Sequence, residues 1–151
     1  MSAAALSPAL QQLLDRAEIV DVVHRYMQAM DHGDGELYLS VLADDVELSG
    51  GKVGIEAARA ACARGFGLAD FDVTRHRTHV VGNVVITLDG DEAHGDVTVV
   101  SIPTGEVEGA PKTLVRGLRY LIGFRRAAEG WRIRRVDQSL SWMYEVVPTR
   151  C

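Results

Sequence analysis

Residues 15–31 read DRAEIVDVVHRYMQAMD, and the apolar spacing in and around them predicts a long amphipathic helix. Apolar residues recur there at steps of three and four, as on one helix face, at Leu13, Ala17, Val20, Val23, Met27 and Met30. Pro8 favours a helix start before this segment, and Gly33 and Gly35 favour its end. The core of the protein is therefore expected to form against this helical stripe.

After this helix, the pattern predicts two shorter helices and then a run of strands. We expect helices at about 35–43 and 54–65, with a short alternating strand at 46–48 between them. Asp89-Gly90 is a strong hairpin signal. The expected strands around it are 73–88, 92–102, 113–126 and 131–142, and a loop rich in Pro, Gly and Glu is expected at 103–111. Helices followed by an antiparallel meander indicate an α+β fold, whose twisted sheet curls into an open cup with the helices on one face.

The composition is that of a globular protein and argues against several classes of partner. The chain has 151 residues, with 47% hydrophobic and 25% charged, so we expect a single domain over residues 1–151. The net charge of −5 argues against nucleic acid and anionic membranes, because both attract basic surfaces. The two cysteines, Cys62 and Cys151, make no disulfide framework and no zinc cluster. Neither a membrane span nor a secretory leader is evident, so we expect a cytoplasmic protein.

Asp31 stands out because it continues the apolar stripe of the first helix. It lies four residues after Met27 and seven after His24, and a carboxylate on an apolar face is costly unless it is paired. Two interpretations are open: Asp31 either caps or leaves the helix end, or it points into the cup as a functional carboxylate. His24 shares the stripe and Tyr26 lies on its shoulder. Both are candidates for the cup, and a packed core side chain is the alternative for each.

The predicted long strand carries two histidines, His76 and His79, of which one is expected to enter the cup. Side chains alternate between the faces of a strand, so residues 79, 81, 83 and 85 share one face and residues 76, 80, 84 and 86 the other, unless a bulge intervenes. A rim or surface position is the alternative for either histidine. The pair points to opposite sides and is not expected to chelate a metal, and the chain lacks nucleotide-binding glycine motifs. We expect no metal and no cofactor.

Later strands contain further polar and aromatic candidates. Asp96 and His94 share a face of one strand. Arg135 and Asp137 share a face of the last strand, where a surface salt bridge is the simpler explanation. Trp142 clusters with the two residues after it and is open to three interpretations: pocket wall, dimer interface or core.

These segments resemble the SnoaL-like proteins of the nuclear-transport-factor-like superfamily. The resemblance rests on residues 15–31, on their continuation through Leu37 to Glu47, and on four later motifs in family order. The motifs are His79-Val-Val-Gly-Asn83, Leu88-Asp-Gly-Asp-Glu-Ala93, Gly117-Leu-Arg-Tyr120 and Gly130-Trp-Arg-Ile-Arg134. The match covers about residues 10–142 and implies an α+β cone, in which three N-terminal helices and a curled mixed or antiparallel sheet enclose one pocket.

Within that superfamily the residues are most similar to the scytalone dehydratase branch, which includes a hexachlorocyclohexane dehydrochlorinase and a bile-acid dehydratase. The resemblance implies a catalytic aspartate ending the first helix, here Asp31, and a catalytic histidine on the long strand, here His79. Tyr26 matches the tyrosine of the bile-acid enzyme. The residues expected to bind the substrate are His24, Met27, Ser101, Tyr120 and Trp142. Ser101 and Ile122 depart from the pattern, since they stand where some relatives carry acidic residues.

The resemblance implies a cofactor-free acid/base enzyme, a dehydratase or other lyase or an isomerase, acting on a hydrophobic metabolite of polyketide or terpene type. In this hypothesis His79 abstracts a proton from an activated carbon and Asp31 orients His79, while Tyr26 donates a hydrogen bond to the carbonyl or the leaving oxygen. Polyketide cyclisation and epoxide opening are alternatives, the latter with Asp96 or Asp137 lining the pocket. A non-catalytic binding or dimerisation module, with its cup filled by side chains, is the third interpretation. We expect a homo-oligomer, either a dimer or a trimer.

Overall fold

The computed structural model describes residues 7–64, 72–107 and 109–146 of the chain. Within these residues the helices are α1 (Pro8–His32), α2 (Gly35–Ser40) and α3 (Ile55–Ala63). The strands are β1 (Leu42–Leu48), β2 (Lys52–Val53), β3 (Asp72–Asp89), β4 (Glu92–Val107), β5 (Ala110–Ala127) and β6 (Gly130–Val146). Among the described residues, no helix is long and apolar enough to cross a membrane.

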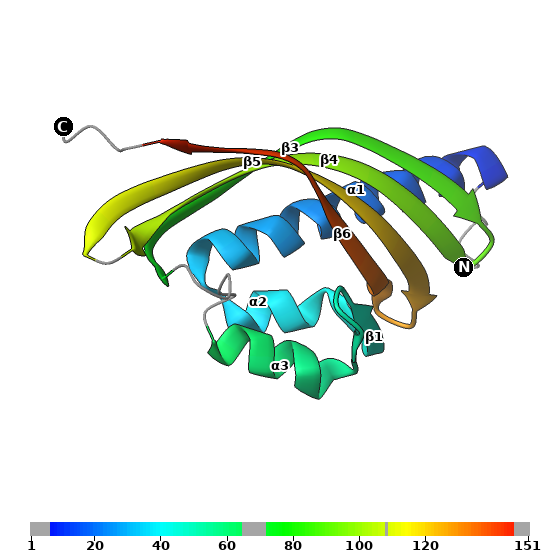
Figure 1. Ribbon diagram of the computed structural model, residues 1–151. Helices are drawn as coiled ribbons and strands as arrows, with labels where there is room; N and C mark the ends of the chain where they lie inside the picture. Colours follow the sequence, from blue (N-terminus) through cyan, green and yellow to red (C-terminus); the bar gives the residue numbers. More distant parts are fainter. Residues whose placement is uncertain (1–6, 65–71, 108, 147–151) are drawn as a thin grey trace.

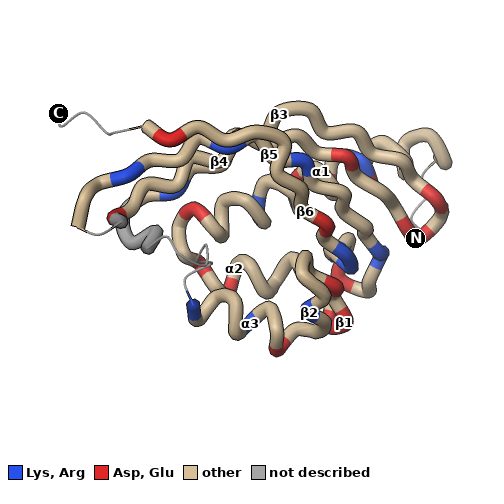
Figure 2. Tube along the Cα trace, in the orientation of Figure 1, with Lys and Arg blue, Asp and Glu red and all other residues tan. Residues whose placement is uncertain are grey.

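The strands of the described residues form one curled sheet in the order β2-β1-β6-β5-β4-β3. Neighbouring strands are antiparallel except β1 and β6, which run parallel. α1 crosses the concave side of the sheet, and α2 and α3 lie beyond α1 next to β1 (Figure 1). Acidic and basic residues are intermixed along the strands (Figure 2). The predicted α+β class and the open, curled sheet are confirmed, and the parallel pair makes the sheet mixed.

α1 forms where the sequence predicts it, but its buried face is rotated relative to the predicted stripe. Ser7 caps the helix by accepting a hydrogen bond from the Leu10 N–H, and Gly33 ends it in the left-handed region at φ 66°. The buried positions are Asp15, Ile19, Val22, Val23, Tyr26, Met27 and Ala29. The buried residues Ile19 and Val23 each directly precede a residue of the predicted face, Val20 and His24, and His24 is exposed. The expectation that His24 lies on the buried face is therefore wrong.

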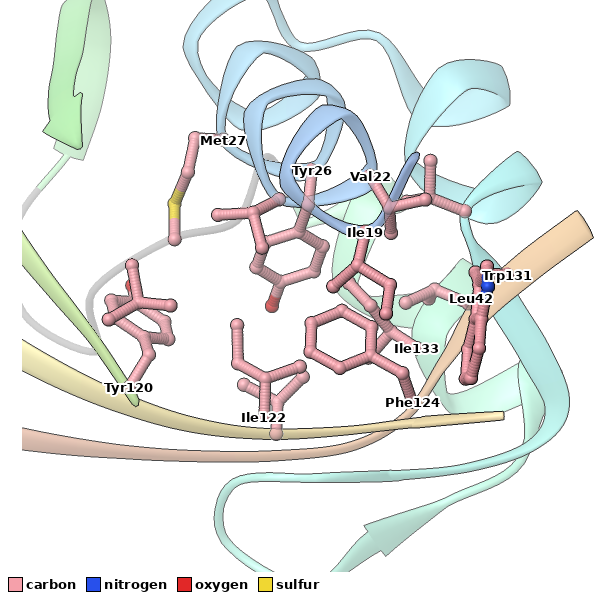
Figure 3. Packing of buried hydrophobic residues seen from close by; sticks show 14 of the residues in the cluster. Ile19, Val22, Tyr26, Met27, Leu42, Tyr120, Ile122, Phe124, Trp131 and Ile133 are labelled. Carbon is pink, nitrogen blue, oxygen red and sulfur yellow. The ribbon is translucent and has the colours of Figure 1, made fainter. Parts of the chain in front are cut away.

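The hydrophobic core lies between α1 and the concave face of the sheet (Figure 3). Its largest fully buried side chains include Trp131, Phe124, Ile19, Met27, Leu118, Ile122 and Ile133. Side chains alternate along β5, so that the even-numbered residues 118–124 are buried whereas Arg119 and Leu121 are exposed. The sheet therefore has an inner face toward α1 and an outer face.

The Asp15 carboxylate anchors the first half of α1 to the sheet. Arg126 of β5 donates to its two oxygens at 2.8 and 2.7 Å, and the Trp131 indole N–H donates at 3.2 Å. The Asp15 side chain is 7% exposed. Its pKa lies well below the usual value, chiefly because of the hydrogen bonds from Arg126. This buried ion pair fixes the position of α1 over the concave face.

The expected loop at 103–111 is wrong, because β4 and β5 continue through it as a hairpin. Thr104 pairs with Thr113, their hydroxyl oxygens lie 2.9 Å apart, and the ladder reaches Val107. Pro103 has no N–H to donate, and the β4–β5 pairing is interrupted beside it before it resumes. Proline and glycine here mark an irregularity of the ladder and not its end.

A β-bulge in β3 decides which side chains of this strand face the concave side. Val81 pairs with Val99 but Val84 pairs with Val97, so β3 carries one more residue than β4 across this step. Before the bulge the odd-numbered residues face inwards, and after it the even-numbered residues do. The expected single face for alternate residues from His79 onwards is therefore wrong beyond the bulge. The bulge allows His79 and the buried second half of β3 to share the inner face.

Candidate active site

At the C-terminal end of α1, the Asp31 carboxylate holds His79 of β3 through two hydrogen bonds. Oδ2 accepts from the backbone N–H of His79 at 2.9 Å, and Oδ1 lies 2.6 Å from Nδ1. The His79 side chain is 3% exposed and that of Asp31 is 17% exposed. Asp31 therefore points onto the sheet. His76 is exposed, so His79 is the histidine of this strand that faces the concave side.

A chain of hydrogen bonds continues from His79 across the next two strands. Ser101 of β4 lies opposite His79 in the ladder, and its Oγ is 3.2 Å from Nε2. Arg116 of β5 lies opposite Ser101 and donates from Nη2 to the same Oγ at 3.0 Å. Because arginine can only donate, the Ser101 hydroxyl is free to donate to Nε2 while Nδ1–H donates to Asp31. The three hydrogen bonds are then all donated in the same direction, from Arg116 through Ser101 and His79 to Asp31.

These surroundings favour a neutral imidazole. The pKa of His79 lies below its usual 6.5, chiefly because burial disfavours the charged ring, although the hydrogen bond to Asp31 acts in the opposite direction. The positive charges of Arg77 and Arg116 lower the pKa further. A neutral ring whose Nδ1–H points to a carboxylate keeps a lone pair on Nε2, which is the arrangement of a general base.

Arg116 is a member of this site that the sequence reasoning missed. It is 9% exposed, and its Nε is buried with no hydrogen-bond partner among the described residues. One signal was available: Arg116 continues the alternation of Leu118 and Tyr120, and an arginine in register with a buried face is uncommon. Arg77, two residues before His79 on the same face of β3, brings a second positive charge close to Arg116.

A pocket of about 200 Å³ lies along the second half of α1. Tyr26 and Tyr38 line it with their rings stacked, 5.2 Å between centres, and their hydroxyl groups share a hydrogen bond. Met30, the residue before Asp31, also lines it, and further lining comes from α3, β1, β2 and β6. Asp31 and His79 are not among its lining residues, and the connection to the dyad along α1 is Met30, which directly precedes Asp31.

Tyr120 connects this pocket to the hydrogen-bond chain. Its side chain is 3% exposed and interacts electrostatically with Arg116 and with Tyr38. Burial raises the pKa of Tyr120 to about 12, so its hydroxyl stays protonated. Figure 3 shows Tyr120 on the sheet side of the core and Tyr26 and Met27 on the α1 side. Met27 is packed in the core at 2% exposure.

Two residues expected to bind the substrate lie away from this site. His24 is exposed on α1. Trp142 pairs with Gly117, whose neighbours Arg116 and Leu118 face inwards, so Trp142 lies on the outer face and is 44% exposed. A Cβ on Gly117 would collide with the Trp142 ring, so the indole uses the space that the glycine leaves. Both expectations are wrong.

The carboxylates of the epoxide-opening alternative lie on the outer face of the sheet. Asp96 accepts a hydrogen bond from Arg119 at 2.9 Å, and Asp137 accepts one from Arg135 at 2.7 Å. With His94 they line a separate outer groove. The salt bridge expected between Arg135 and Asp137 is present. These carboxylates do not take part in the hydrogen-bond chain of the inner face.

The expectations of no metal and no cofactor stay predictions. Over the described part of the chain, no three histidine, cysteine or carboxylate side chains come together as a metal site requires. Both Asp31 oxygens and both ring nitrogens of His79 already have hydrogen-bond partners within the protein.

The family model described as a SnoaL-like domain matches residues 11–137. The chain belongs to the SnoaL-like domain family. No curated protein matches this SnoaL-like protein in sequence. Solved structures share its NTF2-like fold. A scytalone dehydratase-like protein from Novosphingobium aromaticivorans DSM 12444 is 18% identical, with a TM-score of 0.74 and 88% of each chain covered.

Two further structures extend the comparison. An NTF2-like protein with a cystatin-like fold from Novosphingobium aromaticivorans is 27% identical, with a TM-score of 0.72, and covers 93% of this chain and 92% of that chain. A type 2 hexachlorocyclohexane dehydrochlorinase (LinA) is 18% identical, with a TM-score of 0.81, and the match covers 95% of this chain and 96% of that chain. At 18% identity the likeness establishes the common fold, so the reaction has to be argued from the site itself.

Proposed function

We propose that this SnoaL-like protein is a cofactor-independent acid/base enzyme, in which His79 and Asp31 move a proton on a small carbonyl compound and drive elimination of water. The observation that carries the proposal is the buried pairing of a neutral histidine with a carboxylate, at the end of the helix whose Met30 and Tyr26 line a pocket. Proteins of the same fold include a scytalone dehydratase-like protein and a dehydrochlorinase, names that denote eliminations. Double-bond migration and cyclisation would begin with the same proton transfer.

In the proposed reaction, Nε2 of His79 takes the proton from the carbon next to the carbonyl group. The C–H electron pair becomes the new C=C bond and the bond from the β-carbon to its hydroxyl oxygen breaks. The departing oxygen takes the proton back from the imidazolium, which releases water and restores the neutral ring. Asp31 keeps Nδ1 protonated and stabilises the imidazolium. A positioned base of this kind contributes about 10²–10⁴-fold in rate.

The hydroxyl of Ser101 has to give way when the substrate approaches Nε2. Its Oγ–Nε2 distance of 3.2 Å lies at the long end of the roughly 2.7–3.2 Å found for hydrogen bonds between nitrogen and oxygen, so this contact is weak. The hydroxyl proton can rotate away while Arg116 continues to donate to Oγ. In this scheme Tyr26, on the wall of the pocket, donates a hydrogen bond to the carbonyl oxygen of the substrate.

The experiment uses two simple probes. Proton abstraction is followed as deuterium exchange at the α-carbon of 1-tetralone in D2O by NMR, and elimination as conversion of 3-hydroxy-1-tetralone, a cyclic β-hydroxyketone, to 1-naphthol. We expect the wild type to accelerate at least one of these reactions. His79→Gln should lose about 10²–10⁴-fold of that rate, because the base is gone.

The matched control is His94→Gln, since His94 is exposed and lines the outer groove. It should retain the wild-type rate. Full activity in a folded His79→Gln protein, or equal loss in both variants, would contradict the proposal, as would a wild type that accelerates neither reaction.

A further inference from the structure

Arg116 carries a positive charge in the interior, and no ion pair found among the described residues includes it. Elsewhere arginines pair with acids, as Arg119 does with Asp96 and Arg126 with Asp15. Arg116 is 9% exposed, and among the described residues it donates a hydrogen bond to the Ser101 hydroxyl. A guanidinium does not lose its proton in a protein, so burial cannot remove the charge. A buried charge without a counter-ion is costly, which points to an anion that arrives from outside.

Arg116 also has a buried N–H group that lacks a hydrogen-bond acceptor among the described residues. A guanidinium has five N–H groups, of which Nη2 donates to Ser101. Nε is buried and has no hydrogen-bond partner within the described part of the chain. The planar fork of donors matches a carboxylate, which can accept two parallel hydrogen bonds. The unused donors therefore favour a carboxylate over a neutral oxygen.

The charges around Arg116 add to this preference. Arg77 on β3 also lies near His79. The positive charges of Arg77 and Arg116 both lower the pKa of His79. The Asp31 carboxylate near Arg77 already accepts two hydrogen bonds from His79. Two arginines therefore bring positive charge close to His79 on the inner face, in a chain whose formal net charge is −5.

We propose that Arg116 is the anion-binding residue of this site and that the substrate is a hydrophobic carboxylic acid, whose carboxylate Arg116 holds next to His79. This inference rests on the proposed function, because it assigns the substrate class to the same dyad. The neighbours of Arg116 on the inner face, Leu118 along β5 and Val99 on β4, are buried and apolar, which suits the hydrocarbon part of such an acid.

Binding of the carboxylate has an electrostatic consequence for the base. Arg77 and Arg116 lower the pKa of His79, so an anion bound between them and the ring opposes that effect. The pKa of His79 should therefore rise when the acid binds. A substrate of this class would strengthen the base that acts on it.

The test uses benzoate as the carboxylate and benzamide as its neutral analogue, titrated at constant ionic strength into the full chain. Calorimetry measures affinity, and NMR follows the ring of His79 across pH with and without benzoate. The variants are Arg116→Gln, which removes the charge, and Arg116→Lys, which keeps the charge but loses the fork. The control is Arg119→Gln, three residues along the same strand on the outer face.

We expect benzoate to bind the wild type and Arg119→Gln equally, and Arg116→Gln at least about tenfold more weakly, since a charge-assisted hydrogen bond is lost. Arg116→Lys should fall between them, and benzamide should not distinguish the proteins. Benzoate should raise the pKa of His79 in the wild type, which needs no variant to fold. Unchanged benzoate binding in Arg116→Gln, absence of benzoate binding to the wild type, or binding of benzamide to the wild type as tightly as benzoate would overturn the proposal.

The outcomes separate this inference from the proposed function. If the tetralone reactions fail while benzoate binding depends on Arg116, the anion site stands and the acid/base function falls. If His79→Gln loses the reaction while Arg116→Gln binds benzoate like the wild type, the function stands and the substrate class is wrong.

Discussion

His79 binds the Asp31 carboxylate with both its backbone N–H and its ring Nδ1, at 2.9 and 2.6 Å. The first contact ties the carboxylate to β3, and the second fixes the orientation of the ring. One carboxylate therefore positions the imidazole relative to its own strand, which keeps Nε2 directed away from Asp31. The same pairing joins α1 to the sheet at the site.

Asp31→Asn tests the role of this carboxylate. The amide would offer an N–H to Nδ1, which favours the wrong ring tautomer and leaves the imidazolium without its counter-charge. We expect the folded variant to lose about 10²–10⁴-fold in kcat in whichever tetralone reaction the wild type catalyses. The matched control is Asp21→Asn on the same helix, where the side chain is 63% exposed and pairs with Arg25. Equal kcat values for the two variants would contradict the assignment.

The pH dependence of the reaction reports the pKa of His79. Activity requires the neutral ring, so the rate should fall as the pH drops through that pKa, which lies below 6.5. Arg116→Gln removes a positive charge and should move this acid limb to higher pH, whereas Arg119→Gln should leave it in place. A kcat/KM profile measured from pH 4 to 8 or so covers the range. An acid limb above 6.5 in the wild type would be inconsistent with the buried base.

Ser101→Ala separates the hydrogen-bond chain from the dyad. The hydroxyl stabilises the neutral ring at Nε2, so its removal should raise the pKa of His79 in an NMR titration. It also leaves Arg116 Nη2 without an acceptor, which should lower the free energy of unfolding by about 1–3 kcal/mol. Thr98→Ala, at an exposed position of the same strand, is the control and should change neither quantity. A lower pKa of His79 in Ser101→Ala would refute the assignment of the Ser101 hydroxyl as the donor to Nε2.

Asp15→Asn tests the anchor of α1. The substitution weakens the hydrogen bonds that the buried Asp15 carboxylate accepts from Arg126 and Trp131, while the half-exposed Arg126 keeps its ion pair with Asp91, so the free energy of unfolding should fall by about 1–3 kcal/mol in urea denaturation. The exposed pair of Asp45 with Arg125 supplies the control, and Asp45→Asn should cost about 0–1 kcal/mol. Similar losses for the two variants would show that the buried pair has no special role.

The same carboxylate makes stability depend on pH. The pKa of Asp15 in the folded protein is lowered below the usual 3.8, so its contribution is present above that value and is lost as the pH falls below it. The wild type should therefore lose stability on acidification below about pH 4, and Asp15→Asn should lose less. Parallel acid-denaturation curves for the two proteins would contradict this linkage.

Local patterns in the sequence indicate the candidates for the dyad, and the resemblance to the family selects among them. Asp31 was noticed because a carboxylate followed an apolar stripe, and His79 because it lay on a long strand in a position that resembles the family. The structure brings these two side chains together. The apolar stripe is a local signal, whereas the choice of His79 over His76 comes from the resemblance, and each residue lies on an element whose type was predicted correctly.

The remaining errors come from features that depend on pairing between strands. The bulge between Val81 and Val84 reverses which residues face inwards, and its position is set by the register with β4. The face of Trp142 depends in the same way on its pairing with Gly117. Arg116 was missed because its importance comes from lying opposite Ser101 across two strands.

NMR of the ring nitrogens of His79 in the wild type at neutral pH needs no substrate and reports directly on the proposed base. The hydrogen-bond chain predicts a neutral ring with the proton on Nδ1 and a lone pair on Nε2. Asp31→Asn should shift the proton toward Nε2. A wild-type ring that carries its proton on Nε2, or that is doubly protonated at this pH, would contradict the assignment of His79 as the base.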